Sequence, residues 1–250
     1  MESRRNFITK SLLALGSTAA ITNTIVANER ISTNVARIGI KKDAVILFQG
    51  DSITDAARNK ENMQPNVANA FGNGYAMLAA SELLNSHASK NLSIFNKGIS
   101  GNRVPDLINR WEKDTFSLNP DILSILIGVN DFWRTKDSGA QNSPAQFKQQ
   151  YQQLLEQTLQ KYPHVQLIIG EPFAVKNVKH VTDDWYPDFP NYQQVTKEIA
   201  KEFKAVFIPY QSIFDKAEKH APGSYWTTDG VHTTLAGANL MAQAWLNAFK

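Results

Sequence analysis

The sequence predicts an α/β fold with a central, mostly parallel five-stranded sheet. Two observations carry this prediction: short aliphatic runs recur along the chain, and longer stretches with helical spacing of apolar residues alternate with them. Continuous aliphatic runs are typical of strands covered on both faces. Their regular alternation with helices is typical of a parallel sheet flanked by helices. The expected strands are residues 44–49, 92–96, 122–127, 165–170 and 205–208.

Four stretches between or after these strands are expected to be helices. In residues 144–161 the apolar side chains recur at the spacing of one helical face, as they do in the C-terminal stretch 235–249. Further helices are expected over residues 74–85 and 105–113. No internal repeat or long linker interrupts residues 40–250, which indicates one domain of ordinary size.

The first 27 residues have the pattern of an export leader. Arg4-Arg5 precedes a modest apolar segment, residues 11–26, that is too short and too weakly apolar to span a membrane. The order resembles a bacterial twin-arginine signal, so export to the periplasm or beyond is expected. The alternative is a disordered basic N-terminus or a membrane anchor. Residues 28–42 are expected to be a linker and residues 43–250 the folded domain.

Composition excludes several classes of function. The formal net charge of the 250-residue chain is only +3, and the basic residues are scattered, so nucleic acid is not an expected partner. Cysteine is absent, which excludes disulfides and thiolate metal ligands. The sequence contains no zinc-protease motif, phosphate loop or dinucleotide fingerprint, so no cofactor and no metal is expected.

Three polar, glycine-containing motifs directly follow the first three expected strands. They are Gly50-Asp51-Ser52, residues 98–102 and residues 128–131. In a parallel sheet the carboxyl ends of the strands share one edge, where ligands bind. We therefore expect the three motifs to meet at that edge.

A serine nucleophile with an Asp/His pair is the chemistry that these motifs suggest. The hydroxyl of Ser52 would project from a tight turn, and Asp229 lies three residues before His232, close enough to orient its imidazole. Each piece alone has an ordinary interpretation, as a turn or as the start of a helix. Asp51 is expected to tie down the turn rather than to act as an acid.

The same edge would supply hydrogen-bond donors for a developing oxyanion. Candidate donors are the backbone N–H groups of Ser52 and Gly101 and the side-chain amide of Asn130. Without their context, Gly101 would be a turn glycine and Asn130 a helix cap.

Taken together, four ordered blocks resemble those of the SGNH hydrolases, also called GDSL esterases/lipases. The blocks begin at Gly50, Gly98, Gly128 and Asp229. The resemblance implies a three-layer α/β/α, flavodoxin-like fold. It also implies the following site residues: Ser52 as nucleophile, Asp229 and His232 as its partners, and Ser52, Gly101 and Asn130 as the oxyanion hole.

The resemblance is strongest to exported bacterial carbohydrate acetylesterases, which implies hydrolysis of short acyl esters, especially acetyl esters, on carbohydrates. Alternatives are a lysophospholipase, an arylesterase or a thioesterase of the same family, or a non-catalytic carbohydrate-binding protein. Among the aromatic residues near the motifs, Trp133, Phe173 and Trp226 are candidates for substrate binding, although each is equally suited to packing.

Overall fold

The computed structural model describes residues 37–249, so the expected leader of residues 1–27 and most of the expected linker lie outside the described residues. Within them, five parallel strands form one sheet in the order β2-β1-β3-β4-β5. Each strand matches its expected range to within one residue at either end. The strands are β1 (Val45–Gly50), β2 (Ser93–Asn96), β3 (Ile122–Leu126), β4 (Gln166–Gly170) and β5 (Val206–Ile208).

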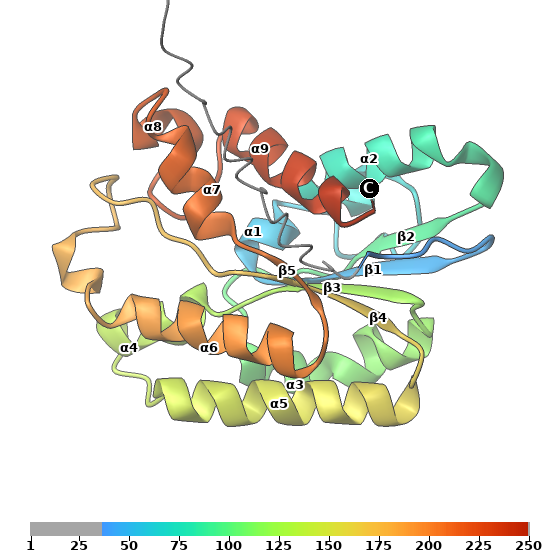
Figure 1. The fold of residues 1–250 in the computed structure, drawn as a ribbon, viewed down its shortest axis with the longest axis horizontal. Coiled ribbons are helices and arrows are strands. Elements are labelled where there is room, and N and C mark those ends of the chain that lie inside the picture. The colour runs from blue at the N-terminus through green and yellow to red at the C-terminus, as the bar shows by residue number, and fades with distance from the viewer. Residues whose placement is uncertain (1–36, 250) are drawn as a thin grey trace, which may run out of the picture. The chain divides into compact units, whose positions relative to one another are not determined.

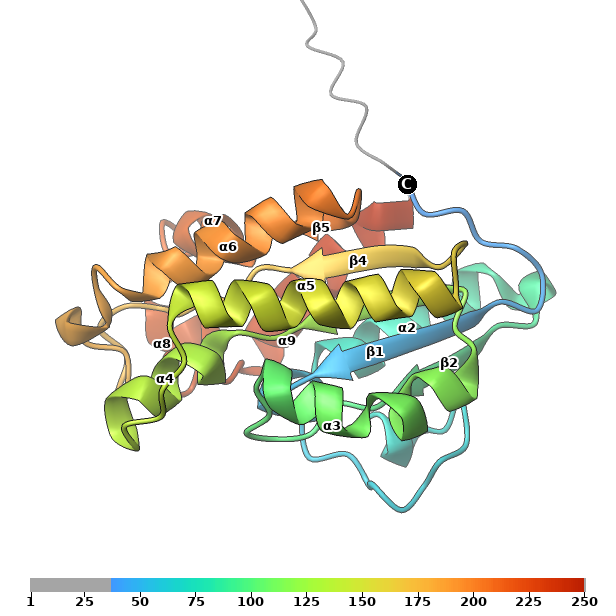
Figure 2. The same ribbon diagram turned by 90° about the horizontal axis from the view of Figure 1, so that it is seen from below.

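Helices cover both faces of the sheet, which confirms the α/β prediction (Figure 1). The longer helices on one face are α2 (Tyr75–Ser86) and α9 (Leu235–Leu246). Those on the other face, seen from below in Figure 2, are α3 (Val104–Asp114), α5 (Pro144–Lys161) and α6 (Phe189–Glu202). Shorter helices are α1 (Ser52–Asp55), α4 (Val129–Asp137), α7 (Tyr210–Ala217) and α8 (Gly223–Trp226). Of all these, α2, α3, α5 and α9 were the expected ones.

The sheet is buried on both faces, which explains why its strands read as continuous aliphatic runs. Ile46, Leu47 and Phe48 of β1 are each fully buried. On one face, the Trp245 ring of α9 packs against Phe48 with ring centroids 4.7 Å apart. The indole N–H of Trp245 also donates to Ser124 Oγ in β3 at 2.9 Å. Helix α9 is therefore held to the sheet.

The direction in which successive strands are added to the sheet reverses between β1 and β3. From β1 the chain adds β2 on one side and then β3, β4 and β5 on the other. In open α/β sheets the crevice at such a point, beyond the carboxyl ends of the strands, is where ligands bind. Gly50 and Leu126, the last residues of β1 and β3, are directly paired there. No helix within residues 37–249 is long and apolar enough to cross a membrane.

Candidate active site

The turn after β1 is shaped by a glycine and a capping carboxylate. A Cβ on Gly50 would lie 2.4 Å from the Leu126 carbonyl oxygen, so only glycine fits beside β3. Asp51 Oδ1 accepts a hydrogen bond from the Ile53 N–H at 3.0 Å and caps the short helix α1. The prediction that Asp51 ties down the turn is confirmed, and Ser52 stands at the first position of α1.

Ser52, His232 and Asp229 form one chain of hydrogen bonds. His232 Nε2 lies 2.8 Å from Ser52 Oγ, although the two residues are 180 positions apart. On the other side of the ring, His232 Nδ1 lies 2.7 Å from Asp229 Oδ2. Such a serine can pass its proton to the imidazole while its oxygen attacks, because the carboxylate orients the ring and stabilises the imidazolium that forms.

Asp229 is held in place by its own turn. Its Oδ1 accepts hydrogen bonds from the N–H groups of His232 at 2.8 Å and Val231 at 3.0 Å. Burial raises the pKa of Asp229, but the hydrogen bonds from His232 and Val231 outweigh burial, and the pKa is held below its ordinary value. The carboxylate is therefore ionised when it faces the imidazole.

A glycine in the same turn allows it to pack tightly against the rest of the fold. Gly230 has a φ of +95°, and a Cβ there would lie 2.4 Å from Val181 Cγ2. Its carbonyl accepts from the Val175 N–H at 2.8 Å, and the Thr228 N–H donates to the His232 carbonyl at 2.8 Å. The position of the imidazole is thus set by backbone contacts with a segment more than forty residues earlier in the chain.

The three expected oxyanion donors lie in segments that contact one another. The Asn130 side-chain amide is buried and donates to the Asn102 carbonyl at 3.3 Å, which joins the start of α4 to the loop that carries Gly101. Gly101 has a φ of +81°, and a Cβ there would meet no atom within 4 Å, so this position borders open space. Within the described part of the chain, the backbone N–H groups of Ser52 and Gly101 have no hydrogen-bond acceptor.

Two side chains that follow Ser52, and that no sequence motif indicated, hold the loop that carries Gly101. Asp55 Oδ2 accepts from the Ser100 N–H at 2.8 Å, and the Arg58 Nε donates to the Gly98 carbonyl at 2.8 Å. Asp55 also forms an ion pair with Lys60 at 2.8 Å. Nothing in the spacing of these residues could have revealed contacts with a loop about forty positions away.

Two buried carboxyls, those of Asp51 and Asp131, are the sequence neighbours of Ser52 and Asn130. Burial raises the pKa of Asp51 to about 7, and the charge of Asp131 contributes to this rise. Burial likewise raises the pKa of Asp131 to about 7. Asp131 Oδ1 accepts hydrogen bonds from the Val104 N–H at 3.1 Å and from the Asn142 amide at 2.9 Å. Asp131 therefore links the first turns of α3 and α4 next to Asn130.

A cleft of about 410 Å³ opens at the Ser52 hydroxyl; we call it the Ser52 cleft. Small side chains such as Ala56 form part of its wall, and Lys60 and Asn73 lie at its exposed side. Its lining residues are Ser52, Ile53, Asp55, Ala56, Ala57, Lys60, Asn73, Gly74, Ser100, His232 and Thr233. Within residues 37–249, no three Asp, Glu or His side chains are grouped so that they could hold a metal ion.

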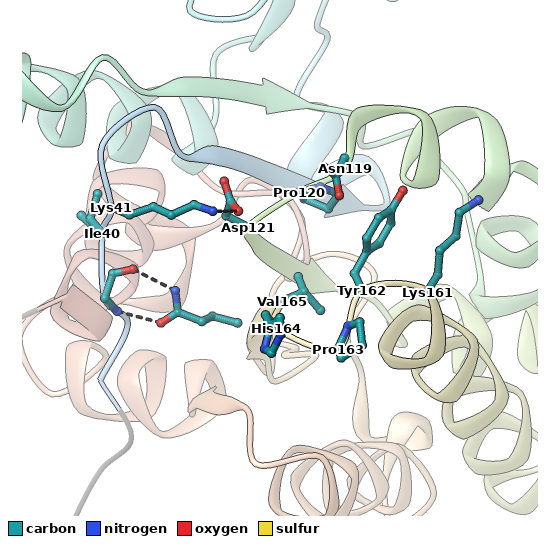
Figure 3. A pocket seen from close by; sticks show the side chains of 12 residues that line it. Ile40, Lys41, Asn119, Pro120, Asp121, Lys161, Tyr162, Pro163, His164 and Val165 are labelled. Carbon is teal, nitrogen blue, oxygen red and sulfur yellow. Dashed lines mark hydrogen bonds and ion pairs between the residues drawn. The ribbon is translucent and has the colours of Figure 1, made fainter.

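A second hollow of about 620 Å³ lies at the opposite edge of the sheet, where the loops enter the amino ends of β1, β3 and β4 (Figure 3). Its walls are joined by the ion pair between Lys41 and Asp121 at 2.6 Å and by two hydrogen bonds between Gln166 and the backbone of Gly39. Ser52 and His232 are not part of its lining, so it does not serve their chemistry.

The three aromatic candidates for substrate binding do not line the Ser52 cleft. Phe173 is fully buried and stacks on Phe214 with centroids 4.4 Å apart, so the expectation that its ring contacts a substrate is wrong. The reason is that α7 covers the segment after β4 and turns this ring into the core. Trp133 packs beside Trp185, and the Trp226 indole donates to the Ala221 carbonyl at 3.1 Å.

Most of the chain is similar to known proteins. The GDSL-like Lipase/Acylhydrolase family matches residues 48–240. The acetylxylan esterase of Geobacillus stearothermophilus is 32% identical over 203 residues, which cover 80% of this chain and 91% of that enzyme.

Solved structures agree as well. A crystal structure of a candidate GDSL-like lipase from Parabacteroides merdae superposes with a TM-score of 0.84 at 42% identity, covering 85% of this chain and 98% of that one. The acetylxylan esterase of Geobacillus stearothermophilus superposes with a TM-score of 0.76 at 30% identity, covering 85% of this chain and 96% of that one. The chain therefore belongs to the GDSL-like lipase/acylhydrolase family and is an ester hydrolase.

Proposed function

We propose that this protein is a serine esterase that removes short acyl groups, acetyl above all, from carbohydrates. The observation that carries the proposal is the hydrogen-bonded chain from Ser52 Oγ through His232 to Asp229 at the Ser52 cleft. The acetylxylan esterase of Geobacillus stearothermophilus, similar over most of the chain, supports the choice of acyl group and of alcohol. Structures of catalytic mutants of that esterase carry alanine in place of a serine or of an aspartate.

The reaction proceeds in two halves through a covalent acyl-enzyme. His232 Nε2 accepts the proton of Ser52 as Oγ attacks the ester carbonyl. The oxyanion is stabilised by the N–H groups of Ser52 and Gly101 and by the Asn130 amide, and the tetrahedral intermediate collapses as His232 gives its proton to the departing alcohol. A water molecule then attacks the acyl-serine, His232 takes its proton, and the free acid leaves.

The shape of the Ser52 cleft favours a small acyl group. Ala56, Ala57 and Gly74 keep the walls beside Ser52 small, and Ser100 and Asn73 give the cleft a polar side. The buried aromatic residues after β4, including Phe173, lie in the core and do not line this cleft. A long acyl chain would therefore expose its methylene groups to water and gain little from binding.

A chain-length series tests both the nucleophile and the acyl preference. With p-nitrophenyl esters from acetyl to long acyl chains, the wild type is expected to prefer acetyl. Ser52→Ala should lower kcat by a factor on the order of 10⁶. Ser138→Ala, which changes an exposed serine after α4, is the matched control and should leave the rate unchanged.

Two outcomes would contradict the proposal. Equal rates of hydrolysis for wild type and Ser52→Ala would rule out Ser52 as the nucleophile, and no hydrolysis by either would favour the carbohydrate-binding alternative. A steep preference for long acyl chains would instead favour the lysophospholipase alternative, and a preference set by the aryl or thiol leaving group would favour an arylesterase or a thioesterase.

A further inference from the structure

Two segments that line the Ser52 cleft also line a second depression. The start of α2 contributes Gly74 to the cleft and Leu78, one helical turn later, to the depression. The segment that leads into α9 contributes Thr233 to the cleft and Thr234 and Leu235 to the depression. The depression, which we call the Tyr225 trough, has a volume of about 630 Å³. It is lined by Leu78, Tyr225, Thr234, Leu235, Ala236 and Asn239.

The Tyr225 trough contains apolar side chains that are exposed to solvent. Only four large hydrophobic side chains of residues 37–249 are exposed, and two of them are here: Tyr225 at 56% and Leu235 at 75%. Burying these side chains against other parts of the chain would stabilise the fold, so their joint exposure in one depression indicates a binding surface. Asn239 is also exposed and adds a polar group to one side of the trough.

The Tyr225 ring is held on a rigid backbone that is tied to the His232 segment. Thr234 Oγ1 donates to the Tyr225 carbonyl at 2.6 Å, and the Thr234 N–H donates to the Trp226 carbonyl at 3.0 Å. The ring also contacts Trp226 edge-on, with centroids 4.9 Å apart. An aromatic face held in this way loses little conformational freedom when a flat partner packs on it.

The proton transfer from His232 indicates which part of an ester lies toward this trough. His232 Nε2 gives its proton to the oxygen of the leaving alcohol, so the alcohol must lie on the His232 side of Ser52. The oxyanion and its donors at Gly101 and Asn130 occupy a different side of the attacked carbon. Thr233 lines the Ser52 cleft, and Thr234 and Leu235, which follow it, line the Tyr225 trough, so the segment after His232 is shared by the two depressions.

We propose that the Tyr225 trough is the subsite for the sugar portion of an acetylated oligosaccharide. The proposal rests on the function proposed above and adds the place where the carbohydrate binds. A pyranose ring has an apolar C–H face and a rim of hydroxyls. The C–H face packs on the Tyr225 ring and on Leu235, and the hydroxyls hydrogen-bond to Asn239. An acyl chain would not use the exposed amide of Asn239, and it would lie on the wrong side of His232.

Two substrates with one acyl group and different alcohols test the proposal. Acetylated xylo-oligosaccharides carry sugar rings that can pack on Tyr225, whereas the ethanol portion of ethyl acetate has none. Tyr225→Ala should raise KM for the oligosaccharide about tenfold, the size expected when one stacking face is lost. Its kinetics on ethyl acetate, followed by acid release at constant pH, should be unchanged. Tyr225→Phe keeps the ring and should retain the wild-type KM.

Two further variants sharpen the test. Leu235→Ser should raise KM for the oligosaccharide in the same selective way as Tyr225→Ala. Val67→Ser removes another exposed apolar side chain that lies outside both depressions. It should leave KM unchanged for both substrates.

The proposed subsite would be refuted if Tyr225→Ala and Leu235→Ser left KM for the oligosaccharide unchanged. It would also be refuted if both variants changed KM for the oligosaccharide and for ethyl acetate equally. A changed elution volume in size exclusion together with an unchanged KM would make the trough a contact between copies of the chain. Failure of the proposed function is distinguishable, because the wild type itself would then not hydrolyse the acetylated oligosaccharide.

Discussion

Removal of the Asp55 carboxylate should slow catalysis by loosening the loop that carries Gly101, without changing the hydrogen bonds that join Ser52, His232 and Asp229. In the structure, Asp55 is almost fully buried and accepts from the Ser100 N–H at 2.8 Å. Ser100 precedes Gly101, whose N–H is a proposed oxyanion donor. Asp55→Ala removes the acceptor, so the loop can move and the Gly101 donor can turn away from the oxyanion.

The size of both effects follows from these contacts. Loss of one hydrogen bond to a carboxylate costs about 1–3 kcal/mol of unfolding free energy, and the lower part of that range applies because water can reach the exposed Ser100. The Lys60 partner is 48% exposed, so its ion pair adds less than about 1 kcal/mol. Misplacing one oxyanion donor lowers kcat by about 100-fold, while KM changes little because the donor acts mainly in the transition state.

Steady-state kinetics on p-nitrophenyl acetate and urea denaturation measure the two effects separately. Asp55→Asn keeps an oxygen acceptor for the Ser100 N–H and should recover most of kcat. Lys60→Ala breaks the ion pair alone and should stay within about twofold of the wild-type kcat, as expected for an exposed pair. If Asp55→Ala were as active as Lys60→Ala, Asp55 would not position the Gly101 loop and the reasoning would be refuted.

Two further changes have definite expected outcomes. The pKa of Asp131 is about 7 in the folded protein against 3.8 ordinarily, so the folded state binds more protons and the unfolding free energy falls as pH rises from about 4 to 7. Asp131→Asn has no carboxyl at this position, so in urea denaturation its unfolding free energy should rise relative to that of wild type between about pH 5 and about pH 8. Parallel pH profiles of the unfolding free energy for the two proteins would contradict this prediction. Replacing both Arg4 and Arg5 by lysine should block the predicted export, which cell fractionation would detect as retention of the full-length chain inside the cell, and unchanged export would rule out a twin-arginine route.

Strand positions were predictable because they depend on local composition. A strand buried on both faces must be continuously apolar, as Ile46-Leu47-Phe48 shows, and this leaves a mark that needs no knowledge of neighbours. Helix α6 was not among the expected elements, although Tyr192, Thr196 and Ile199 of this helix are buried. Its start follows a loop rich in Asp, Trp and Pro, and that composition hides a helix whose stability comes from packing on β4, β5 and α5.

The geometry of the candidate site was predictable in part for a related reason. The strand-end rule brings Ser52, Gly101 and Asn130 to one edge, and the three-residue spacing lets Asp229 reach His232. The supporting contacts of Asp55 and Arg58 were not predictable, because each joins segments about forty residues apart through a single side chain.

The sequence alone predicted the sheet, the order of the motifs and the type of chemistry, because each depends on short patterns of residues that are neighbours along the chain. The tertiary structure alone decided which aromatic rings are open to a substrate. Phe173 follows a strand end but is covered by α7, whereas Tyr225 stays 56% exposed beside the His232 segment. Exposure is the outcome of packing between distant segments, and no local pattern records it.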